Sequence, residues 1–164
     1  MADNVTIVGF AELQAALEKS AAQALEVTRR QVAASGLELE TEAKKNLTAV
    51  GGVDTGQARA ATRYRASDGG MGAEVASPNP VAAAIEFGTA PAGALKQHFP
   101  PPKALEGWAR RHGMTEPGAA FLIARKIALR GIPARPWLSK AHDTIAPKFE
   151  SDLKSAINKL LDSL

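Results

Sequence analysis

The longest run of regularly spaced apolar positions extends from Phe10 to about Leu47. Apolar residues recur there at steps of three, four or seven, which places them on one face of an α-helix. No proline interrupts the run, and only Gly36 invites a bend. At about 1.5 Å per residue such a helix is roughly 55 Å long, more than the diameter of a compact domain of this size. The pattern predicts a helix that either bends back on itself or projects and packs on another subunit.

A weaker pattern follows the glycine pair Gly51-Gly52, which ends the helix. The side chains of Asp54 and Thr55 can accept hydrogen bonds from backbone N–H groups one or two residues on, and so begin a turn or a short helix over Gln57–Ala61. An antiparallel hairpin is then predicted from two weakly alternating segments around a glycine-rich turn, Thr62–Ser67 and Gly72–Ser77.

The middle of the chain is an apolar run, Val81–Phe87, which fits either a helical turn or a buried strand, because periodicity does not distinguish them. Glu86 lies in this run, just before Gly88. An unpaired buried charge is costly, so we expect Glu86 to bind an arginine or backbone N–H groups, within the chain or across a subunit boundary. Gly88 indicates a sharp turn that a side chain would obstruct. We interpret this stretch as a structural junction.

Proline and glycine divide the second half of the chain into helices. Pro102 suits the first turn of a helix whose apolar stripe includes Trp108 and His112. Thr115 is predicted to cap the next helix, with Pro117 in its first turn and Gly131 at its end. Two short helices are therefore predicted between the apolar run and the last part of the chain.

The segment Pro133–Trp137 is held extended by its two prolines. A stiff segment loses little entropy when it docks, so we expect Trp137 to be largely buried, against its own sheet or against a neighbour. A final helix is predicted from Leu138 to Leu164, kinked or restarted at Pro147.

Together these elements predict an α+β fold, in which a long N-terminal helix and a C-terminal helix pack on a small antiparallel sheet. At 164 residues the chain is expected to form a single domain. Its parts are a long helix, a small sheet region, a loop with a helical insertion, and an extended segment with a C-terminal helix: 10–50, 51–89, 90–131 and 132–164.

Composition narrows the chemistry further. The chain has no cysteine, which excludes disulfides and thiolate metal sites and fits a reducing compartment. The N-terminus lacks the features of a signal peptide, and no apolar run approaches the roughly 20 residues that span a bilayer, so we expect a soluble, cytoplasmic protein without a membrane partner. The histidines His98, His112 and His142 have no helical pairing, and His112 is expected to be packed at a helix end. We predict no metal, no cofactor and no enzymatic site.

Positive charge is concentrated in one part of the chain. Between Lys96 and Lys140 there are nine lysines and arginines against two acids, Glu106 and Glu116. This asymmetry indicates a surface that faces phosphates or an acidic partner, although a solvated helix face explains it equally well. A nucleic-acid-binding module is therefore one alternative function. The three bases near the end of one predicted helix are Arg125, Lys126 and Arg130.

The tripeptide Asp54-Thr55-Gly56 is the one that carries the catalytic aspartate of aspartic proteases. That chemistry needs two carboxylates sharing a proton, so a single copy would require a homodimer. Here a glycine pair and Val53 replace the apolar strand that should lead into the tripeptide. A turn or an interface is therefore favoured over a protease.

An ordered set of short motifs resembles a family of long-tailed phage morphogenesis proteins, the tail-component or neck proteins encoded between the head and tail genes. The motifs carrying the resemblance follow the long helix and precede the last one: Val53–Gly56, Ile85–Thr89 and Ala134–Leu138. Two further segments resemble a helical insertion found in many members, Pro101–Trp108 and Phe121–Ile127. The resemblance covers about residues 5–150. Gln57-Ala58 stands where leucine often follows the glycine, and Trp137 stands where phenylalanine is usual.

The resemblance implies a non-enzymatic structural protein of a phage or prophage. Such a protein is a subunit of a ring of roughly six or twelve copies at the head–tail junction, acting in tail completion or head–tail joining. Its partners would be copies of itself, other neck and tail proteins, and DNA that passes through the ring. It would be located in the virion, and in the host cytoplasm during assembly.

The motif residues expected at subunit interfaces or in structural roles are Asp54, Thr55, Gly56, Glu86, Phe87, Gly88, Thr89, Arg135, Pro136 and Trp137. Arg125, Lys126 and Arg130 are the candidates for facing DNA in the channel. Alternatively, these bases face an acidic surface of a neighbouring subunit, such as the Glu38, Glu40 and Glu42 side of the first helix.

Overall fold

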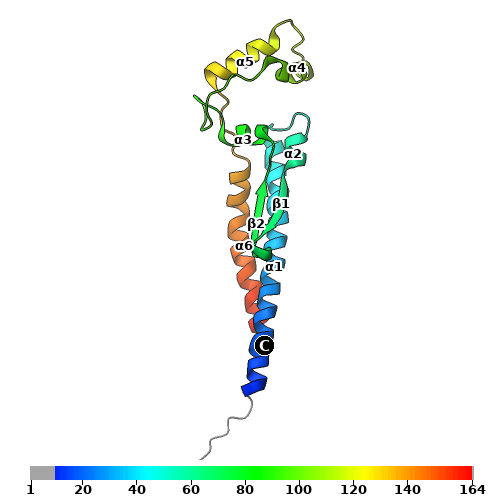
Figure 1. Ribbon diagram of the computed structural model, residues 1–164, viewed down its shortest axis with the longest axis vertical. Helices are drawn as coiled ribbons and strands as arrows, with labels where there is room; N and C mark the ends of the chain where they lie inside the picture. Colours follow the sequence, from blue (N-terminus) through cyan, green and yellow to red (C-terminus); the bar gives the residue numbers. More distant parts are fainter. Residues whose placement is uncertain (1–9, 164) are drawn as a thin grey trace, which may run out of the picture.

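The computed structural model describes residues 10–163. Two helices form an elongated shaft (Figure 1): α1, Phe10–Ala49, and α6, Leu138–Leu161, which runs back along α1 in the opposite direction. Helix α1 is one unbroken element of 40 residues, as the apolar pattern predicts. Helix α6 continues through Pro147, so the predicted restart at that proline is wrong.

A two-stranded antiparallel sheet lies on α1 (Figure 1). Strands β1, Arg63–Ser67, and β2, Gly72–Ala76, pair in register from Arg63 opposite Ala76 to Ser67 opposite Gly72. The turn between them is a short 3-10 element, η1, Asp68–Gly70. The hairpin predicted from the sequence is confirmed.

Gly36 of α1 permits close contact between the helix and this hairpin. A Cβ atom at Gly36 would collide with the ring of Tyr64 and would lie 3.1 Å from the Cβ of Ala73. The helix continues through this glycine without a break, and the missing side chain makes room for the sheet.

Two short helices close the upper end of the shaft. Helix α2, Gln57–Ala61, follows the loop after α1, and helix α3, Pro80–Phe87, follows β2. The side chain of Asn79 caps α3 by accepting a hydrogen bond from the N–H of Val81 at 2.9 Å. The apolar run that fitted a helix or a strand is therefore a helix. The core beneath these helices is small and alanine-rich: Ala43, Leu47, Ala58, Val75, Ala82, Ile85, Trp137 and Ala141.

The helical insertion projects beyond the upper end of the shaft (Figure 1). It contains α4, Pro102–Arg111, and α5, Ala119–Arg130, which pack on each other. Helix α5 begins only after Gly118, whose backbone is left-handed at φ 83°. The predicted cap at Thr115 is therefore wrong, because this turn redirects the chain and leaves Pro117 before the helix. The end of α5 at Gly131 is confirmed.

These elements form an α+β fold with long N- and C-terminal helices and a small antiparallel sheet. Among residues 10–163, no helix has the length and apolar character needed to cross a membrane.

Candidate assembly site at the junction of shaft and insertion

Glu86 caps helix α6 from the last turn of α3. Its carboxylate accepts hydrogen bonds from the backbone N–H groups of Trp137 at 2.7 Å and Leu138 at 2.8 Å. It also accepts from the backbone N–H of Ser139 at 3.1 Å and from the Ser139 hydroxyl. The first N–H groups of a helix have no partner within the helix, and they carry the positive end of its dipole. A carboxylate there satisfies them and joins two distant parts of the chain.

The electrostatics of Glu86 follow from these bonds. The residue is only 5 % exposed, and burial by itself raises the pKa of its carboxyl. The hydrogen bonds from the Ser139 hydroxyl and from the three backbone N–H groups outweigh burial and lower the pKa below its ordinary value. The expectation that Glu86 binds backbone N–H groups is confirmed, and its partners belong to the same chain.

Trp137 ties the same junction to the shaft. The side chain is 2 % exposed, as predicted, and its indole Nε1–H donates to the carbonyl of Ala82 in α3 at 3.1 Å. Its own carbonyl accepts a hydrogen bond from the side chain of Asn46 in α1 at 3.3 Å. One tryptophan therefore contacts the three helices that meet here.

Arg135 adds a further connection through its backbone and its side chain. Its N–H donates to the carbonyl of Ile85 at 2.7 Å, and its guanidinium donates to the carbonyl of Val50 at 2.8 Å. The second bond gives a donor to the carbonyl of the residue that directly follows α1. Pro136 lies half-buried between Arg135 and Trp137.

Gly88 and Thr89 hold the two ends of the insertion together. Gly88 has φ 64°, and a Cβ atom there would lie 2.5 Å from the carbonyl oxygen of Ile132 and 2.6 Å from the nitrogen of Ala134. The obstruction predicted for a side chain at Gly88 is thus confirmed. The N–H of Thr89 donates to the Ile132 carbonyl at 2.8 Å, and the N–H of Ile132 donates to the Thr89 hydroxyl at 2.9 Å. Phe87, by contrast, is 50 % exposed and is open to a neighbour.

Asp54 serves a different role from the predicted one. Its carboxylate accepts hydrogen bonds from Arg111 of α4, one of them from Nε at 3.0 Å, instead of capping α2. Helix α2 begins after Gly56, whose φ of 80° is left-handed, and no side chain caps it. Thr55 is exposed. The Asp54–Arg111 ion pair fastens the loop after α1 to the insertion.

This environment also bears on the protease alternative. The hydrogen bond from Arg111 lowers the pKa of the Asp54 carboxyl. A catalytic pair of aspartates needs one carboxyl that keeps a proton, with a raised pKa. The guanidinium favours the opposite, a fully ionised carboxylate.

The bases on α5 form an exposed surface with apolar neighbours. Arg125, Lys126 and Arg130 are exposed and make no ion pair within residues 10–163. The same helix exposes three large apolar side chains: Phe121 at 51 %, Leu122 at 61 % and Leu129 at 63 %. We call these six residues the α5 surface.

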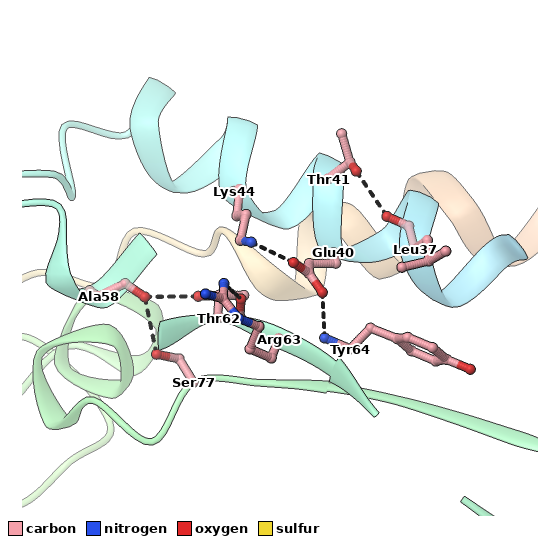
Figure 2. A network of polar contacts seen from close by, with 9 residues as sticks. All are labelled: Leu37, Glu40, Thr41, Lys44, Ala58, Thr62, Arg63, Tyr64 and Ser77. Atoms are coloured by element: carbon pink, nitrogen blue, oxygen red, sulfur yellow. Dashed lines mark hydrogen bonds and ion pairs between the residues drawn. The ribbon is translucent and has the colours of Figure 1, made fainter. Parts of the chain in front are cut away.

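The acidic side chains proposed as a counterpart on α1 already have partners. Figure 2 shows the carboxylate of Glu40 between the Lys44 ammonium and the backbone N–H of Tyr64, to which it is bonded at 2.6 Å. Glu38 pairs with Lys148 of α6, and Glu42 pairs with Lys45 at 3.2 Å. This side of α1 is thus neutralised within the chain.

The histidines are not brought together. Among the residues that the structure describes, no group of three histidine or acidic side chains could hold a metal ion. His112 lies at the C-terminal end of α4, as predicted, and packs there on the Trp108 ring at 4.1 Å between centroids, although the residue is exposed.

The three motifs thus meet at one place, and most of their residues make contacts that join shaft and insertion. Sequence reasoning missed Arg111 and Ser139, the partners of the two motif carboxylates. The position of Ser139 in the first turn of α6 is the only local signal for either. Comparison of the chain with family models, curated proteins and solved structures found no match.

Proposed function

We propose that the protein is a structural, non-enzymatic subunit of the neck of a long-tailed phage or prophage. It forms a ring with copies of itself at the head–tail junction and acts in tail completion or head–tail joining. Other neck and tail proteins bind the ring, and DNA passes through it. Assembly takes place in the host cytoplasm, and the finished ring is part of the virion.

The observation that carries this proposal is the amount of surface that one chain leaves exposed. Its accessible surface is 11149 Å², whereas a compact monomer of 17.2 kDa exposes about 7800 Å². Part of this difference belongs to the residues outside the described range, and the rest reflects the elongated shaft and the projecting insertion. A specific contact with a neighbour covers about 800 Å² of one subunit, so a surface of this size leaves room for such contacts.

The kind of surface supports the same proposal. Among the described residues, few large apolar side chains are buried completely, and Trp137 and Leu47 are the largest of them. Exposed large apolar side chains are more numerous among the described residues, and they include Leu17, Leu25 and Leu161 on the shaft and Phe121, Leu122 and Leu129 on the insertion. Contacts between two unlike patches of identical chains generate closed rings when the rotation closes.

The motifs agree with a structural role. Three motif side chains form hydrogen bonds with backbone groups of the same chain: Glu86, Trp137 and Arg135. They set the position of the insertion on the shaft, which a ring requires to be the same in every copy. The resemblance of these motifs to those of phage neck proteins is our reason for placing the proposed ring at the head–tail junction.

Nucleic-acid binding is the second candidate, and one observation favours it. The three bases of the α5 surface project into solvent without an ion-pair partner in the described residues, so phosphates can reach them. In the proposed ring, these bases make a few salt-sensitive contacts per subunit with DNA phosphates, and the contacts do not depend on the base sequence.

Light scattering after size-exclusion chromatography, with negative-stain images of the concentrated protein, tests the proposal. We expect a ring of six or more copies. A monomer at every concentration would overturn the ring, and a stable dimer would favour the protease alternative. Salt titration of DNA binding distinguishes the second candidate: tight binding by a monomeric protein, weakening steeply with salt, would support an independent nucleic-acid-binding module.

A further inference from the structure

An apolar groove runs along the middle of the shaft, between α1, α6 and the start of β2. Its volume is about 260 Å³. The α1 wall extends from Val32 to Leu39 and the α6 wall from His142 to Phe149, so each wall spans seven residue steps, or about 10.5 Å. Leu39 and Phe149 are only half-buried, so the groove is open in the single chain. Most of its lining is apolar: Val32, Leu39, Met71, Ala73, Ile145 and Phe149.

Acidic side chains lie along both sides of this groove. On α6, Asp143 and Glu150 are exposed, and the lining residue Ala146 follows the first by three positions and precedes the second by four, so both acids are its neighbours on the helix surface. On β2, Glu74 is exposed on the outward face of the sheet and forms no ion pair within residues 10–163, not even with Arg65 opposite it. The two acids of α6 pair within their own helix at 3.5 Å and 3.7 Å. Exposed pairs of this kind are weak and leave the charges available to a partner.

The exposed face of α5 has the complementary pattern. Leu122 and Leu129 are seven residues apart, the same spacing as each wall of the groove. At 3.6 residues per turn, Arg125 flanks the two leucines on one side of the helix, whereas Lys126 and Arg130 flank them on the other. Two leucines with one base on one side and two on the other match an apolar groove with one acid on β2 and two on α6.

We propose that α5 of a second copy of the chain binds in this groove. The two leucines contact the apolar lining, Arg125 faces Glu74, and the other two bases face the acids of α6. The leucines favour a protein partner over DNA, because a protein interface buries apolar side chains whereas phosphates gain little from them. The inference rests on the proposed ring and names one of its contacts, a head-to-tail contact between unlike surfaces.

The α5 helix of the same chain does not lie in the groove. It packs on α4, and the insertion projects beyond the upper end of the shaft (Figure 1). The Asp54–Arg111 ion pair and the hydrogen bonds between Thr89 and Ile132 hold the insertion in that position. The helix that occupies the groove therefore comes from a neighbouring copy.

Exchange of charges between the two surfaces tests this contact in the full-length protein. One variant carries Lys126→Glu and Arg130→Glu, and a second carries Asp143→Lys and Glu150→Lys. We expect each variant to keep the native melting temperature and to raise the concentration needed for assembly by about tenfold or more. All four changes in one chain should restore most of the assembly, because opposite charges again face each other.

Glu12→Lys with Glu18→Lys is the matched control for the second variant. It changes the net charge equally, at exposed positions of α1 that precede the groove residue Val32 by at least 14 residues, or about 21 Å. We expect this control to assemble like the native protein. Equal losses in the control, or no recovery in the fourfold variant, overturn the contact.

The state of the native protein separates this inference from the proposed function. If native rings form and both charge variants also assemble normally, the contact is wrong and the proposed function stands. If the native protein is monomeric at every concentration, both are overturned. If the α5 variant loses DNA affinity but not assembly, the surface faces DNA and the contact is overturned.

Cysteine cross-linking gives an independent measurement, because the chain has no cysteine of its own. A tagged copy carries Leu122→Cys, and an untagged copy carries Met71→Cys in the groove or, as control, Leu37→Cys. Leu37 is 56 % exposed and Met71 is 41 % exposed, but Leu37 lies on the face of α1 opposite to Leu39 and the groove. A short bifunctional thiol reagent should link the groove position about tenfold more than the control, since binding raises the local concentration of the two thiols. Equal yields contradict the inference.

Discussion

The junction and the α5 surface use charged residues in opposite ways. At the junction, the carboxylate of Glu86 is buried and accepts four hydrogen bonds from the same chain. On α5, the charged side chains are bases, and they project into solvent beside exposed leucines. The difference indicates that most of the motif residues hold the fold of the single chain together, so under the proposed function the partners bind at other surfaces.

The largest effect is expected from truncation of Trp137. Trp137→Ala removes the largest fully buried side chain and leaves a cavity among three helices, so we expect a loss of about 3–5 kcal/mol of unfolding free energy. Denaturant unfolding measures it. Trp108→Ala in the half-buried part of α4 is the control and should cost much less. Similar losses of unfolding free energy for both variants would show that the junction does not stabilise the fold more than the insertion does.

The next effect concerns the cap on α6. Glu86→Ala leaves three N–H groups without an acceptor and should cost about 1–3 kcal/mol. Glu86→Gln keeps the shape and one acceptor oxygen, so its loss should be smaller. Melting temperatures of both variants, with Glu38→Ala of the exposed pair with Lys148 as control, decide the point. Near-zero changes for both Glu86 variants would remove this residue from the junction.

The distance between partners explains what could be predicted from sequence. The helix of α1 and the hairpin depend on local patterns, and both were predicted. Glu86 and Trp137 are 51 residues apart, and Asp54 and Arg111 are 57 apart, so no local pattern identifies these pairs. Burial of a charge implied that Glu86 needs a partner, but only the packing of α3 against α6 shows which one.

Local rules also failed where a glycine overrode them. Thr115 has the chemistry of a helix cap, but the left-handed backbone at Gly118 delays α5. Gly36 invites a bend by its residue type, but α1 continues through it and the missing side chain admits the Tyr64 ring. In both cases the tertiary arrangement, which a single sequence does not contain, decided the role of the residue.

A smaller effect is expected from acid. Because the folded-state pKa of Glu86 is lowered, its contribution is complete above the unfolded-state pKa and is lost as pH falls through the folded-state value. Below about pH 4, the stability of the native protein should therefore fall more steeply than that of Glu86→Gln. Parallel pH profiles of unfolding free energy for the two proteins would show that the carboxylate does not act as an ionised cap.

The ion pair between Asp54 and Arg111 should affect the insertion more than overall stability. It is partly exposed, and such pairs contribute little to unfolding free energy. We expect Asp54→Asn to leave the melting temperature nearly unchanged and to speed amide hydrogen exchange in α4. The α1 amides serve as the internal control. Unchanged exchange in α4 would mean that the Thr89–Ile132 contacts alone hold the insertion.

The smallest effect on folding is expected on the α5 surface, where a change should affect assembly instead. Reversing Arg125, Lys126 and Arg130 to glutamate should leave the melting temperature unchanged, because the three side chains are exposed and have no ion-pair partner in the described residues. If the surface contacts another subunit, assembly is lost without a change in DNA affinity. If it lines the channel, rings form normally but DNA passage is blocked. Normal particles with normal infectivity would make the cluster a solvated helix end.

A second variant separates these outcomes by using the apolar part of the same surface. Leu122→Ser and Leu129→Ser remove exposed apolar side chains without changing any charge. DNA phosphates gain little from leucine, whereas a protein interface buries it. We expect the leucine variant to lose assembly together with the charge reversal, because both groups lie on one helix and one partner would cover them. Loss of DNA passage in the charge reversal alone, with normal assembly of the leucine variant, would assign the surface to the channel.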